Sequence, residues 1–325
     1  MIHIVCCSDR NYIMPTGIMM KSVSMNNYET EIVFHVIVDE EVSEEQKALL
    51  EKNISDVPGH VIAFHTIDSS SMESFPKLGE VALHVTKATY YRLYMAAILP
   101  ESIDKVVYLD GDIICRHSLV NLWECDMGEF AVSCVKDVCN NDIRKYNQLR
   151  YPSENGYFNA GVLLINLRYW RELHCSEHFA ELIKNEPDRI LFHDQDVLNI
   201  CFQKSKIDLP LRYNLQNGFL YTKPHLLIDY QKYGEELERA IIDPVFIHYT
   251  ATPKPWTEKC FHPFKSEFLY YKAHSLWANV PLQKDKKTMK EDMRNLLVNL
   301  HLLTPNAKWK EPFRTDIALK NNRNE

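Results

Sequence analysis

Glycine is scarce in this chain, and no glycine-rich phosphate-binding loop occurs in it. Nine of the 325 residues are glycine, whereas an average protein has about 7%. Neither the G-x-G-x-x-G fingerprint of dinucleotide-binding folds nor the G-x-x-x-x-G-K-[ST] loop of nucleotide hydrolases occurs. If the protein binds phosphate groups, it must neutralise them with a metal ion and a few cationic side chains.

Other absences narrow the class of protein. No run reaches the roughly 18 apolar residues that a membrane-spanning helix needs, and the first residues do not read as a signal peptide. The nine cysteines are odd in number and include no Cys-x-x-Cys pair, which favours a reducing cytoplasm. The net charge of −7 argues against nucleic acid as a partner.

Strand-like and helix-like segments alternate along the chain. The strand candidates are residues 2–7, 31–38, 61–67, 105–109, 129–135, 157–166 and 245–249. The helix candidates include residues 13–25, 43–53, 86–98, a segment beginning within 189–203, and 264–277. This alternation predicts an α/β fold with a parallel sheet, in which ligands bind outside the carboxyl ends of the strands.

Two aspartates follow the most apolar of the central strands. Val106–Leu109 is a short β-favouring run, and Asp110 and Asp112 come directly after it, with Gly111 between them. Side chains at i and i+2 of an extended chain point to the same side, so the two carboxylates should converge and need a cation. The alternatives are a polar turn, for which Asp-Gly is common, and a haloacid-dehalogenase-type phosphatase, whose aspartates normally follow the first strand.

His248 is the candidate third ligand of this metal site. It ends the strand 245–249, and Lys254 follows six residues later on a proline-containing loop, where it could reach a diphosphate. Two carboxylates and one imidazole suit Mn²⁺ better than Ca²⁺, and Mg²⁺ usually prefers oxygen ligands alone. A histidine at a strand end can also be merely structural.

Two further polar segments, one after the first predicted strand and one at the start of the helix predicted within 189–203, have both a structural and a functional interpretation. Asp9, Asn11 and Tyr12 follow the first strand, where they could cap the next helix or hold a base and ribose. Asp194 could be an N-cap, with Asp196 as first-turn charge facing the helix dipole.

The last segment of the chain has the opposite charge from the rest. Residues 283–325 contain ten Lys and Arg against six Asp and Glu, interleaved with leucines, Trp309 and Phe313. We therefore expect residues 1–281 to form the main domain and 282–325 a helical basic extension. The extension could contact an anionic membrane surface or pack on the body of the protein.

Six motifs in order along the chain resemble those of glycosyltransferase family 8, in particular the bacterial lipooligosaccharide α-galactosyl- and α-glucosyltransferases. The motifs lie at residues 7–12, 89–93, 107–112, 158–167, 194–199 and 248–256. Two positions depart from the family pattern: Ala251 stands where glycine is frequent, and Cys7-Ser8 where two alanines are common.

This resemblance implies a GT-A fold, a Rossmann-like fold with a mixed, mainly parallel sheet that binds a nucleotide sugar. It also implies a retaining hexosyltransferase that uses Mn²⁺, or Mg²⁺, and UDP-glucose or UDP-galactose. By motif, Asp110, Asp112 and His248 would bind the metal. The donor would be held by Cys7, Ser8, Asp9, Asn11, Tyr12, Arg92, Asp110, Gly111, Asp112, Asn159, Ala160, Asp194, Gln195 and Lys254.

The same resemblance suggests how the configuration at the sugar is retained. By resemblance, Gln195 stands at the family position opposite the leaving group. Its amide is a poor nucleophile, so attack from the leaving group's own face is favoured over double displacement. Asp194 is the alternative nucleophile.

The acceptor, a glycan or glycolipid of lipopolysaccharide or another surface polysaccharide, should lie near residues 140–155 and 214–233. A non-catalytic or hydrolytic sugar-nucleotide-binding protein is the alternative function, and the inner face of the cytoplasmic membrane is a candidate location.

Overall fold

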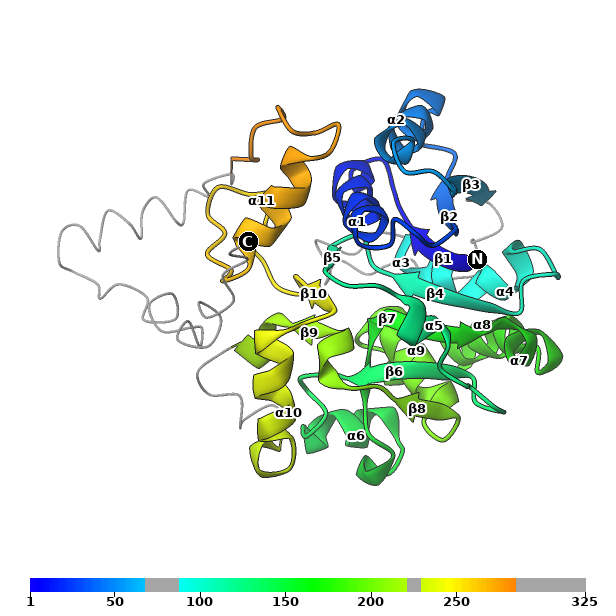
Figure 1. Ribbon diagram of the computed structural model, residues 1–325. Helices are drawn as coiled ribbons and strands as arrows, with labels where there is room; N and C mark the ends of the chain where they lie inside the picture. Colours follow the sequence, from blue (N-terminus) through cyan, green and yellow to red (C-terminus); the bar gives the residue numbers. More distant parts are fainter. Residues whose placement is uncertain (68–87, 221–228, 285–325) are drawn as a thin grey trace, which may run out of the picture.

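A seven-stranded mixed sheet forms the centre of the molecule (Figure 1), described here by a computed structural model covering residues 1–67, 88–220 and 229–284. The strand order is β3-β2-β1-β4-β7-β6-β8. The strands are β1 (Ile2–Cys7), β2 (Ile32–Asp39), β3 (His60–Ile67), β4 (Lys105–Leu109), β6 (Val132–Lys136), β7 (Phe158–Asn166) and β8 (Lys206–Asp208). Every neighbouring pair is parallel except the two that include β7, so the expected mixed, mainly parallel sheet is confirmed.

A small second sheet stands beside the carboxyl edge of the first. Its strands are β5 (Ile113–Cys115), β10 (Phe246–His248) and β9 (Leu215–Gln216), in the order β5-β10-β9. The chain leaves the main sheet at the end of β4, turns at Gly111 and Asp112, and enters β5. The sequence indicated β10 but not β5 or β9, which are only two or three residues long.

Helices and short 3₁₀ turns surround both sheets. The helices are α1 (Ile13–Asn26), α2 (Glu44–Ile54), α3 (Ala88–Tyr91), α4 (Met95–Ile98), α5 (Val120–Trp123), α6 (Ile143–Leu149), α7 (Leu167–Glu172), α8 (Cys175–Asn185), α9 (His193–Phe202), α10 (Tyr230–Ile242) and α11 (Lys265–Ala273). The 3₁₀ turns are η2 (Arg92–Tyr94), η3 (Ser153–Asn155), η4 (Pro187–Arg189), η5 (Leu211–Tyr213) and η6 (Asn217–Leu220). The expected cap of α2 is present: Ser43 and Gln46 form a reciprocal capping box.

Side chains alternate along the central strands and fill two hydrophobic cores, one on each face of the main sheet. In β4, Val107 and Leu109 join the core that includes α1 and α11, whereas Val106 and Tyr108 join the core that includes α3, α8 and α9. Both faces of the central strands are therefore covered (Figure 1), and their carboxyl ends remain as the place for polar chemistry.

Two expected helices are shorter than predicted. The segment 86–98, whose first two residues lie outside the described part, contains α3 and α4 separated by the 3₁₀ turn η2, which begins at Arg92. The helix expected to reach Trp277 ends at Ala273, because the Lys272 ammonium donates to the carbonyls of Trp277, Ala278 and Val280 and folds the chain back. Among the described residues, no helix is long and apolar enough to cross a membrane.

Candidate functional site

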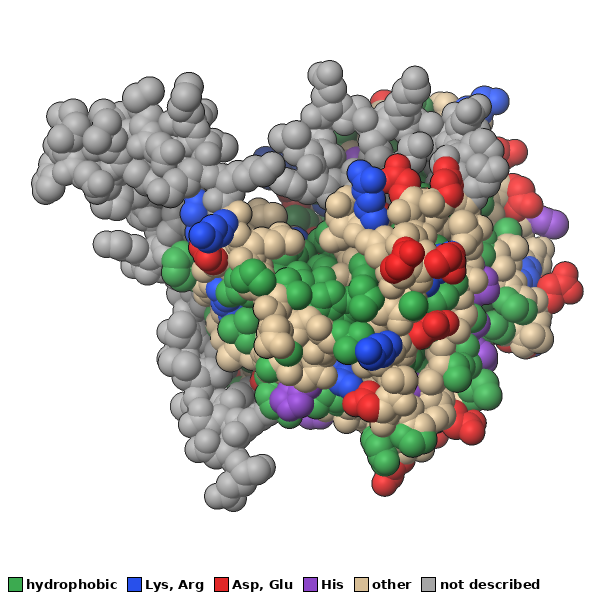
Figure 2. All heavy atoms as spheres, turned by 90° about the horizontal axis from the view of Figure 1, so that it is seen from above, with side chains coloured by type: hydrophobic (Ala, Val, Ile, Leu, Met, Phe, Trp, Pro, Cys, Tyr) green, Lys and Arg blue, Asp and Glu red, His purple; other side chains and the backbone are tan. Residues whose placement is uncertain are grey.

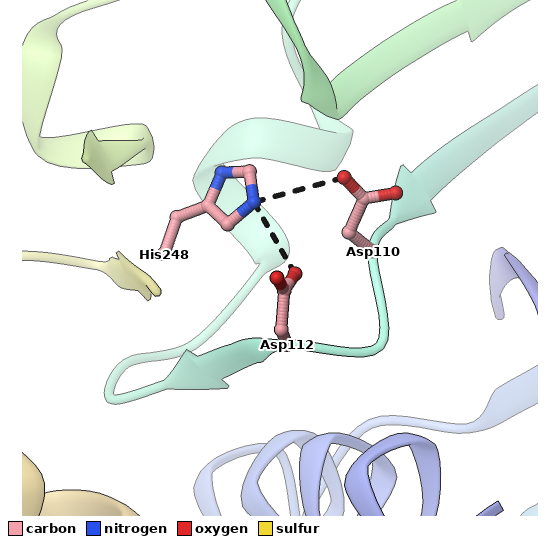
Figure 3. Close-up of side chains that lie close together, drawn as sticks. All are labelled: Asp110, Asp112 and His248. Atoms are coloured by element: carbon pink, nitrogen blue, oxygen red, sulfur yellow. Dashed lines mark ion pairs between the residues drawn. The ribbon is translucent and has the colours of Figure 1, made fainter. Parts of the chain in front are cut away.

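Asp110, Asp112 and His248 converge on one point at the carboxyl end of β4 (Figure 3). Nε2 of His248 lies 3.6 Å from Oδ2 of Asp110 and 3.3 Å from Oδ1 of Asp112. One ligand atom from each of the three residues lies within 4.8 Å of the other two. No other group of three His, Cys, Asp or Glu side chains in the described part of the chain meets this condition. The chemistry of this donor set fits a divalent cation such as Mn²⁺.

The second sheet brings His248 to the two aspartates. β10 runs antiparallel to β5 with His248 opposite Ile113, the residue that follows Asp112. The backbone N–H of Tyr249 donates to the carbonyl of Asp112 over 3.1 Å, which closes this pairing. Two segments far apart in sequence are therefore joined by the backbone at the candidate metal ligands themselves.

Gly161 leaves the space that these ligands occupy. A Cβ added at Gly161 would lie 2.2 Å from Cε1 of His248 and 2.7 Å from Oδ2 of Asp110. The carbonyl of Gly161 also accepts from the backbone N–H of Asp110 at 2.9 Å. Any larger residue here would push the imidazole or the carboxylate out of place.

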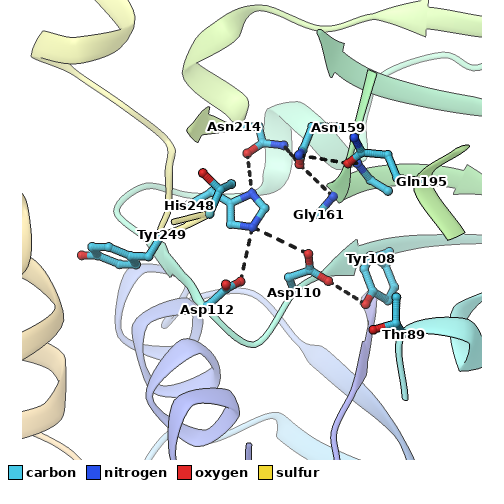
Figure 4. A network of polar contacts seen from close by, with 12 residues as sticks. Thr89, Tyr108, Asp110, Asp112, Asn159, Gly161, Gln195, Asn214, His248 and Tyr249 are labelled. Atoms are coloured by element: carbon cyan, nitrogen blue, oxygen red, sulfur yellow. Dashed lines mark hydrogen bonds and ion pairs between the residues drawn. The ribbon is translucent and has the colours of Figure 1, made fainter. Parts of the chain in front are cut away.

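A chain of hydrogen bonds connects His248 to Gln195 (Figure 4). Nδ1 of His248 lies 2.9 Å from Oδ1 of Asn214, which accepts a hydrogen bond from it when the proton is on Nδ1. The Asn214 amide donates to Oδ1 of Asn159 at 2.8 Å, and the Asn159 amide donates to Oε1 of Gln195 at 3.1 Å. This arrangement leaves the lone pair of Nε2 directed at the aspartates.

Lys254 contributes a cation beside the ligand set. Its ammonium donates to Oδ2 of Asp112 at 2.6 Å and to the carbonyl of Tyr249 at 2.5 Å. Burial by itself would raise the pKa of Asp112, but the neighbouring groups, above all the charge of Lys254, outweigh burial and hold that pKa below its usual range. The Asp112 carboxylate is therefore ionised at neutral pH.

Arg92 is a buried link between Asp110 and Asp194. One guanidinium N–H donates to Oδ1 of Asp110 at 2.8 Å, and another donates to the carbonyl of Ala160 at 2.9 Å. Nε lies 3.0 Å from Oδ2 of Asp194, and the guanidinium stacks 4.4 Å above the ring of Tyr108. Burial alone would lower the pKa of Arg92, but the two carboxylates reverse this and raise it, so the guanidinium stays charged.

Asp194 and Gln195 lie in the first turn of α9 and have different surroundings. Asp194 is buried, and its Oδ2 makes no hydrogen bond with any described residue, because the Arg92 contact has the distance but not the direction of one. Burial raises the pKa of Asp194 to about 7, although Arg92 opposes this shift. The Gln195 carbonyl accepts from the N–H of Ala160 at 3.0 Å as well as from Asn159.

The interpretation of Asp194 as a plain N-cap is wrong. The cap residue of α9 is Phe192, and Asp196 takes the role of acceptor: its Oδ2 accepts from the backbone N–H groups of Leu191 and Phe192 at 2.8 and 2.7 Å. Asp194 points to Arg92 instead. Asp196 is therefore more than a charge facing the helix dipole.

The loop after β1 lies against the turn between the two aspartates. Oδ1 of Asp9 accepts from the backbone N–H groups of Asn11 and Tyr12 at 2.7 and 3.1 Å, so this carboxylate shapes the entry to α1. A Cβ at Gly111 would lie 3.3 Å from the Tyr12 ring, which itself contacts the ring of Trp256 with centroids 5.5 Å apart. Tyr12 occupies the cap position of α1 without a side-chain capping hydrogen bond, so Asp9 stabilises the turn before the helix rather than the helix end, and the loop lies beside the candidate metal ligands.

The first two residues of this loop have defined but different contacts. Ser8 accepts a hydrogen bond from the Thr16 hydroxyl at 3.2 Å. Cys7 lies within the electrostatic reach of Arg92 and Asp110, and burial raises the pKa of its thiol to about 12. Both residues belong to the same end of β1 as Asp9.

Several residues of the network were not predicted as functional. Asp137 accepts from the amide of Gln195 at 3.2 Å and from that of Asn159 at 3.1 Å, and the Tyr157 hydroxyl accepts from Gln195 at 2.9 Å. Asp137 follows a predicted strand, just as Asp110 does, so its position was a usable signal. Asn214 lies in no recognisable motif, and nothing in the local sequence indicates its contact with His248.

Comparisons with known proteins place this site in a family. Residues 3–260 match the model of glycosyl transferase family 8. General stress protein A of Bacillus subtilis is 28% identical over 285 residues, covering 86% of this chain and 96% of that protein. Lipopolysaccharide 1,2-glucosyltransferase of Escherichia coli is 30% identical over 296 residues, covering 89% and 84%. The crystal structure of the galactosyltransferase LgtC with donor and acceptor sugar analogues has a TM-score of 0.76 and 26% identity, covering 90% of this chain and 99% of that one.

Proposed function

Since this chain belongs to glycosyl transferase family 8, we propose that it is a retaining hexosyltransferase. It moves glucose or galactose from a UDP-sugar to a hydroxyl of a glycan or glycolipid acceptor, in the synthesis of lipopolysaccharide or another surface polysaccharide. The observation that carries this proposal is the convergence of Asp110, Asp112 and His248, with Lys254 beside them, at the carboxyl edge of the sheet. The named sugars come from the relatives, a glucosyltransferase and a galactosyltransferase.

Asp110, Asp112 and His248 would hold Mn²⁺, or Mg²⁺ as the alternative. Such a cation would neutralise negative charge on the UDP leaving group. Lys254 would contact a diphosphate oxygen, because its ammonium already lies against a carboxylate of the same ligand set. The methyl of Ala251, where related proteins often have glycine, would restrict how closely the backbone approaches the diphosphate.

The uridine would lie over the end of β1, held by Cys7, Ser8, Asp9, Asn11 and Tyr12. The second carboxylate oxygen of Asp9 is available for a ribose hydroxyl, since Oδ1 is occupied by the backbone. The loop is adjacent to Gly111, which would let the nucleotide continue toward the metal ligands without a side chain in the way.

The transferred hexose would lie among Arg92, Asn159, Ala160, Asp194 and Gln195. Oδ2 of Asp194, which is ion-paired with Arg92 but makes no hydrogen bond, would accept one from a sugar hydroxyl, and the Gln195 carbonyl would stabilise the positive charge that develops on the sugar ring. We favour attack from the same face as the leaving group, in which a phosphate oxygen takes the acceptor's proton. Asp194 is a weaker candidate nucleophile, because its raised pKa leaves part of it protonated near neutral pH.

The test is to incubate the protein with UDP-glucose or UDP-galactose, with Mn²⁺ or with EDTA, and to measure UDP release. Release from one donor that needs the metal would support the proposal, and NMR of the product would report the retained configuration. No metal-dependent release from either donor or another nucleotide sugar would overturn it. Binding without turnover would point to the alternative, a non-catalytic sugar-nucleotide-binding protein, and release without transfer to any glycan would point to a hydrolase.

We also propose that residues 1–281 form the catalytic domain and that the basic extension 282–325 contacts the inner face of the cytoplasmic membrane. The part beyond residue 284 lies outside the described residues. On the face shown in Figure 2, the described acidic and basic side chains are interspersed rather than gathered by sign. The proposed contact with an anionic membrane is therefore assigned to the basic extension and not to this face. Sedimentation of the full chain with anionic vesicles, but not with neutral ones, would support it, and equal sedimentation with both would overturn it.

A further inference from the structure

Two adjoining cavities open at the carboxyl ends of β6 and β8, the smaller between the loops around α6 and the start of α10, and the larger between η5 and α10. One has a volume of about 310 Å³ and the other of about 640 Å³, which is the size range of small-molecule sites. Lys136, Asp208, Lys232 and Tyr233 line both cavities. Neither cavity contains a residue assigned above to the donor or the metal, whereas part of the lining, including Asn141 and Tyr233, falls within the ranges expected to bind the acceptor.

The cavities lie on the same edge of the sheet as the metal ligands. Asp110 ends β4, and Lys136 ends β6, which is two strands further along the order β4-β7-β6-β8. At the usual spacing of strands, β4 and β8 are roughly 14 Å apart. The smaller cavity also adjoins the residues that hold Gln195, since Lys136 precedes Asp137 and Gly156 precedes Tyr157.

The walls of the smaller cavity are polar but carry balanced charge. Three lysines and three acidic residues line it, together with three asparagines: Lys136, Lys206, Lys232, Glu154, Asp208, Asp229, Asn140, Asn141 and Asn155. Asp208 already pairs with Lys136 and with Lys206. An anionic ligand would have to compete with Asp208 and would meet the other two carboxylates, so a neutral ligand rich in hydroxyl groups fits this wall better.

Tyr233 gives the site a flat apolar surface between the two cavities. Its ring is half-buried and lies below the ammonium groups of Lys232 and Lys136, at 5.1 and 5.8 Å from the ring centroid. An aromatic face next to amides, carboxylates and ammonium groups offers an apolar contact and hydrogen bonds together, which a sugar ring needs from its binding site.

We propose that the smaller cavity, with the Tyr233 ring at its border, forms an acceptor subsite that binds a neutral sugar unit away from the hydroxyl that receives the hexose. The inference rests on the proposed function and deepens it: the acceptor is recognised as an oligosaccharide along the edge from β4 to β8, and a monosaccharide occupies only part of the site.

The experiment has two stages and begins with an array of neutral and anionic glycans of one to six sugars, probed with the full chain in the presence of UDP and Mn²⁺. The best neutral oligosaccharide and its terminal monosaccharide are then compared as acceptors. The wild type should have a KM for the oligosaccharide about tenfold below that for the monosaccharide. Tyr233→Ala should abolish this difference, because it removes the central contact of the subsite.

Further variants keep the test interpretable if Tyr233→Ala folds poorly. Asn141→Ala removes an exposed amide on the cavity wall and should raise the oligosaccharide KM by a few-fold, whereas Tyr233→Phe keeps the ring and should retain the preference. Tyr28→Ala, at an exposed tyrosine outside the cavities, is the matched control. The subsite is overturned if Tyr233→Ala and Asn141→Ala leave the preference intact, or if the array shows only anionic glycans or none. UDP release by the wild type without acceptor tests the proposed function separately.

Discussion

Asn214 holds His248 by its Nδ1, 2.9 Å from the asparagine carbonyl oxygen, on the side of the ring opposite the two aspartates. Both side chains are buried. A carbonyl oxygen can only accept, so this contact selects the tautomer with the proton on Nδ1 and leaves Nε2 free to bind a metal. The partners of a metal-binding histidine commonly tune affinity by 10–100-fold.

Asn214→Leu should therefore weaken Mn²⁺ binding by about 10–100-fold, measured by calorimetry or by Mn²⁺ paramagnetic resonance without any substrate. Asn214→Asp keeps the acceptor for Nδ1 of His248 but loses the donor to Asn159, so its Mn²⁺ affinity should lie between those of the wild type and Asn214→Leu. Asn147→Leu, at an exposed position of α6, is the control. Equal affinity in the wild type and Asn214→Leu would show that the contact does not orient the imidazole.

Gly161→Ala should impair the metal site more than the fold. The new methyl would lie within 2.2 Å of the His248 ring, so the imidazole or Asp110 must move, and such overpacking costs about 1–3 kcal/mol. The expected result is a loss of Mn²⁺ affinity with a smaller decrease in thermal stability. Calorimetry and thermal unfolding on the same preparation check both, and unchanged Mn²⁺ affinity would contradict the prediction.

Gln195→Ala should lower kcat by about 10–100-fold while the KM for the donor changes little, because the amide carbonyl is assigned to charge that develops in the transition state. Asp194→Asn should leave measurable activity under same-face attack. Gln231→Ala, an exposed glutamine on α10, is the control. Near-full activity of Gln195→Ala together with complete loss in Asp194→Asn would instead favour Asp194 as a nucleophile.

Acid should destabilise the protein through a row of three histidines across β1, β2 and β3. His35 is buried between His3 and His65, with ring nitrogens 3.0 Å apart on each side. Burial, and to a lesser extent the two neighbouring imidazoles, lowers the pKa of His35 to about 4. Burial lowers the pKa of His3 and His65 as well. The unfolded chain then binds more protons below about pH 6.5.

Stability should be complete well above pH 6.5 and fall as the pH decreases toward 4, by roughly 3 kcal/mol from His35. Urea unfolding at pH 7.5, 6 and 5 measures this slope. His60 and His262 act in the same direction, since burial lowers the pKa of each, so the comparison is with His35→Phe, which should flatten the slope. His178→Phe at an exposed position is the control, and an unchanged slope in His35→Phe would refute the assignment.

Much of the fold and of the site could be predicted because the signals are local. Val106–Leu109 is apolar on both faces of its strand, the capping residues Ser43 and Gln46 are three positions apart, and Asp110 and Asp112 directly follow a strand. Each pattern depends on neighbours within a few residues. The roles of Asp9, Lys254 and Gln195 stay predictions, although their side chains lie at the expected strand and helix ends.

Several of the elements that were missed depend on distant partners, whereas the missed helix α10 has a local signal in its cap residue Asp229. β5 and β9 are strands only because β10 lies between them, and the 3₁₀ turn at Arg92 lies where the guanidinium meets Asp110 and Asp194 from other segments. Asn214 and Asp137 likewise gain their importance from contacts with residues far along the chain.

The sequence by itself determined which residues could bind a cation and at which strand ends they stand, because strand periodicity and motif order are properties of short segments. The tertiary structure alone decided that the Asn214 carbonyl faces His248, that Gly161 leaves room for the imidazole, and that the loops near α6 meet the start of α10 in one cavity. The physical reason is that hydrogen-bond direction and steric fit are fixed by the relative positions of segments more than 30 residues apart, which only the packed sheets define.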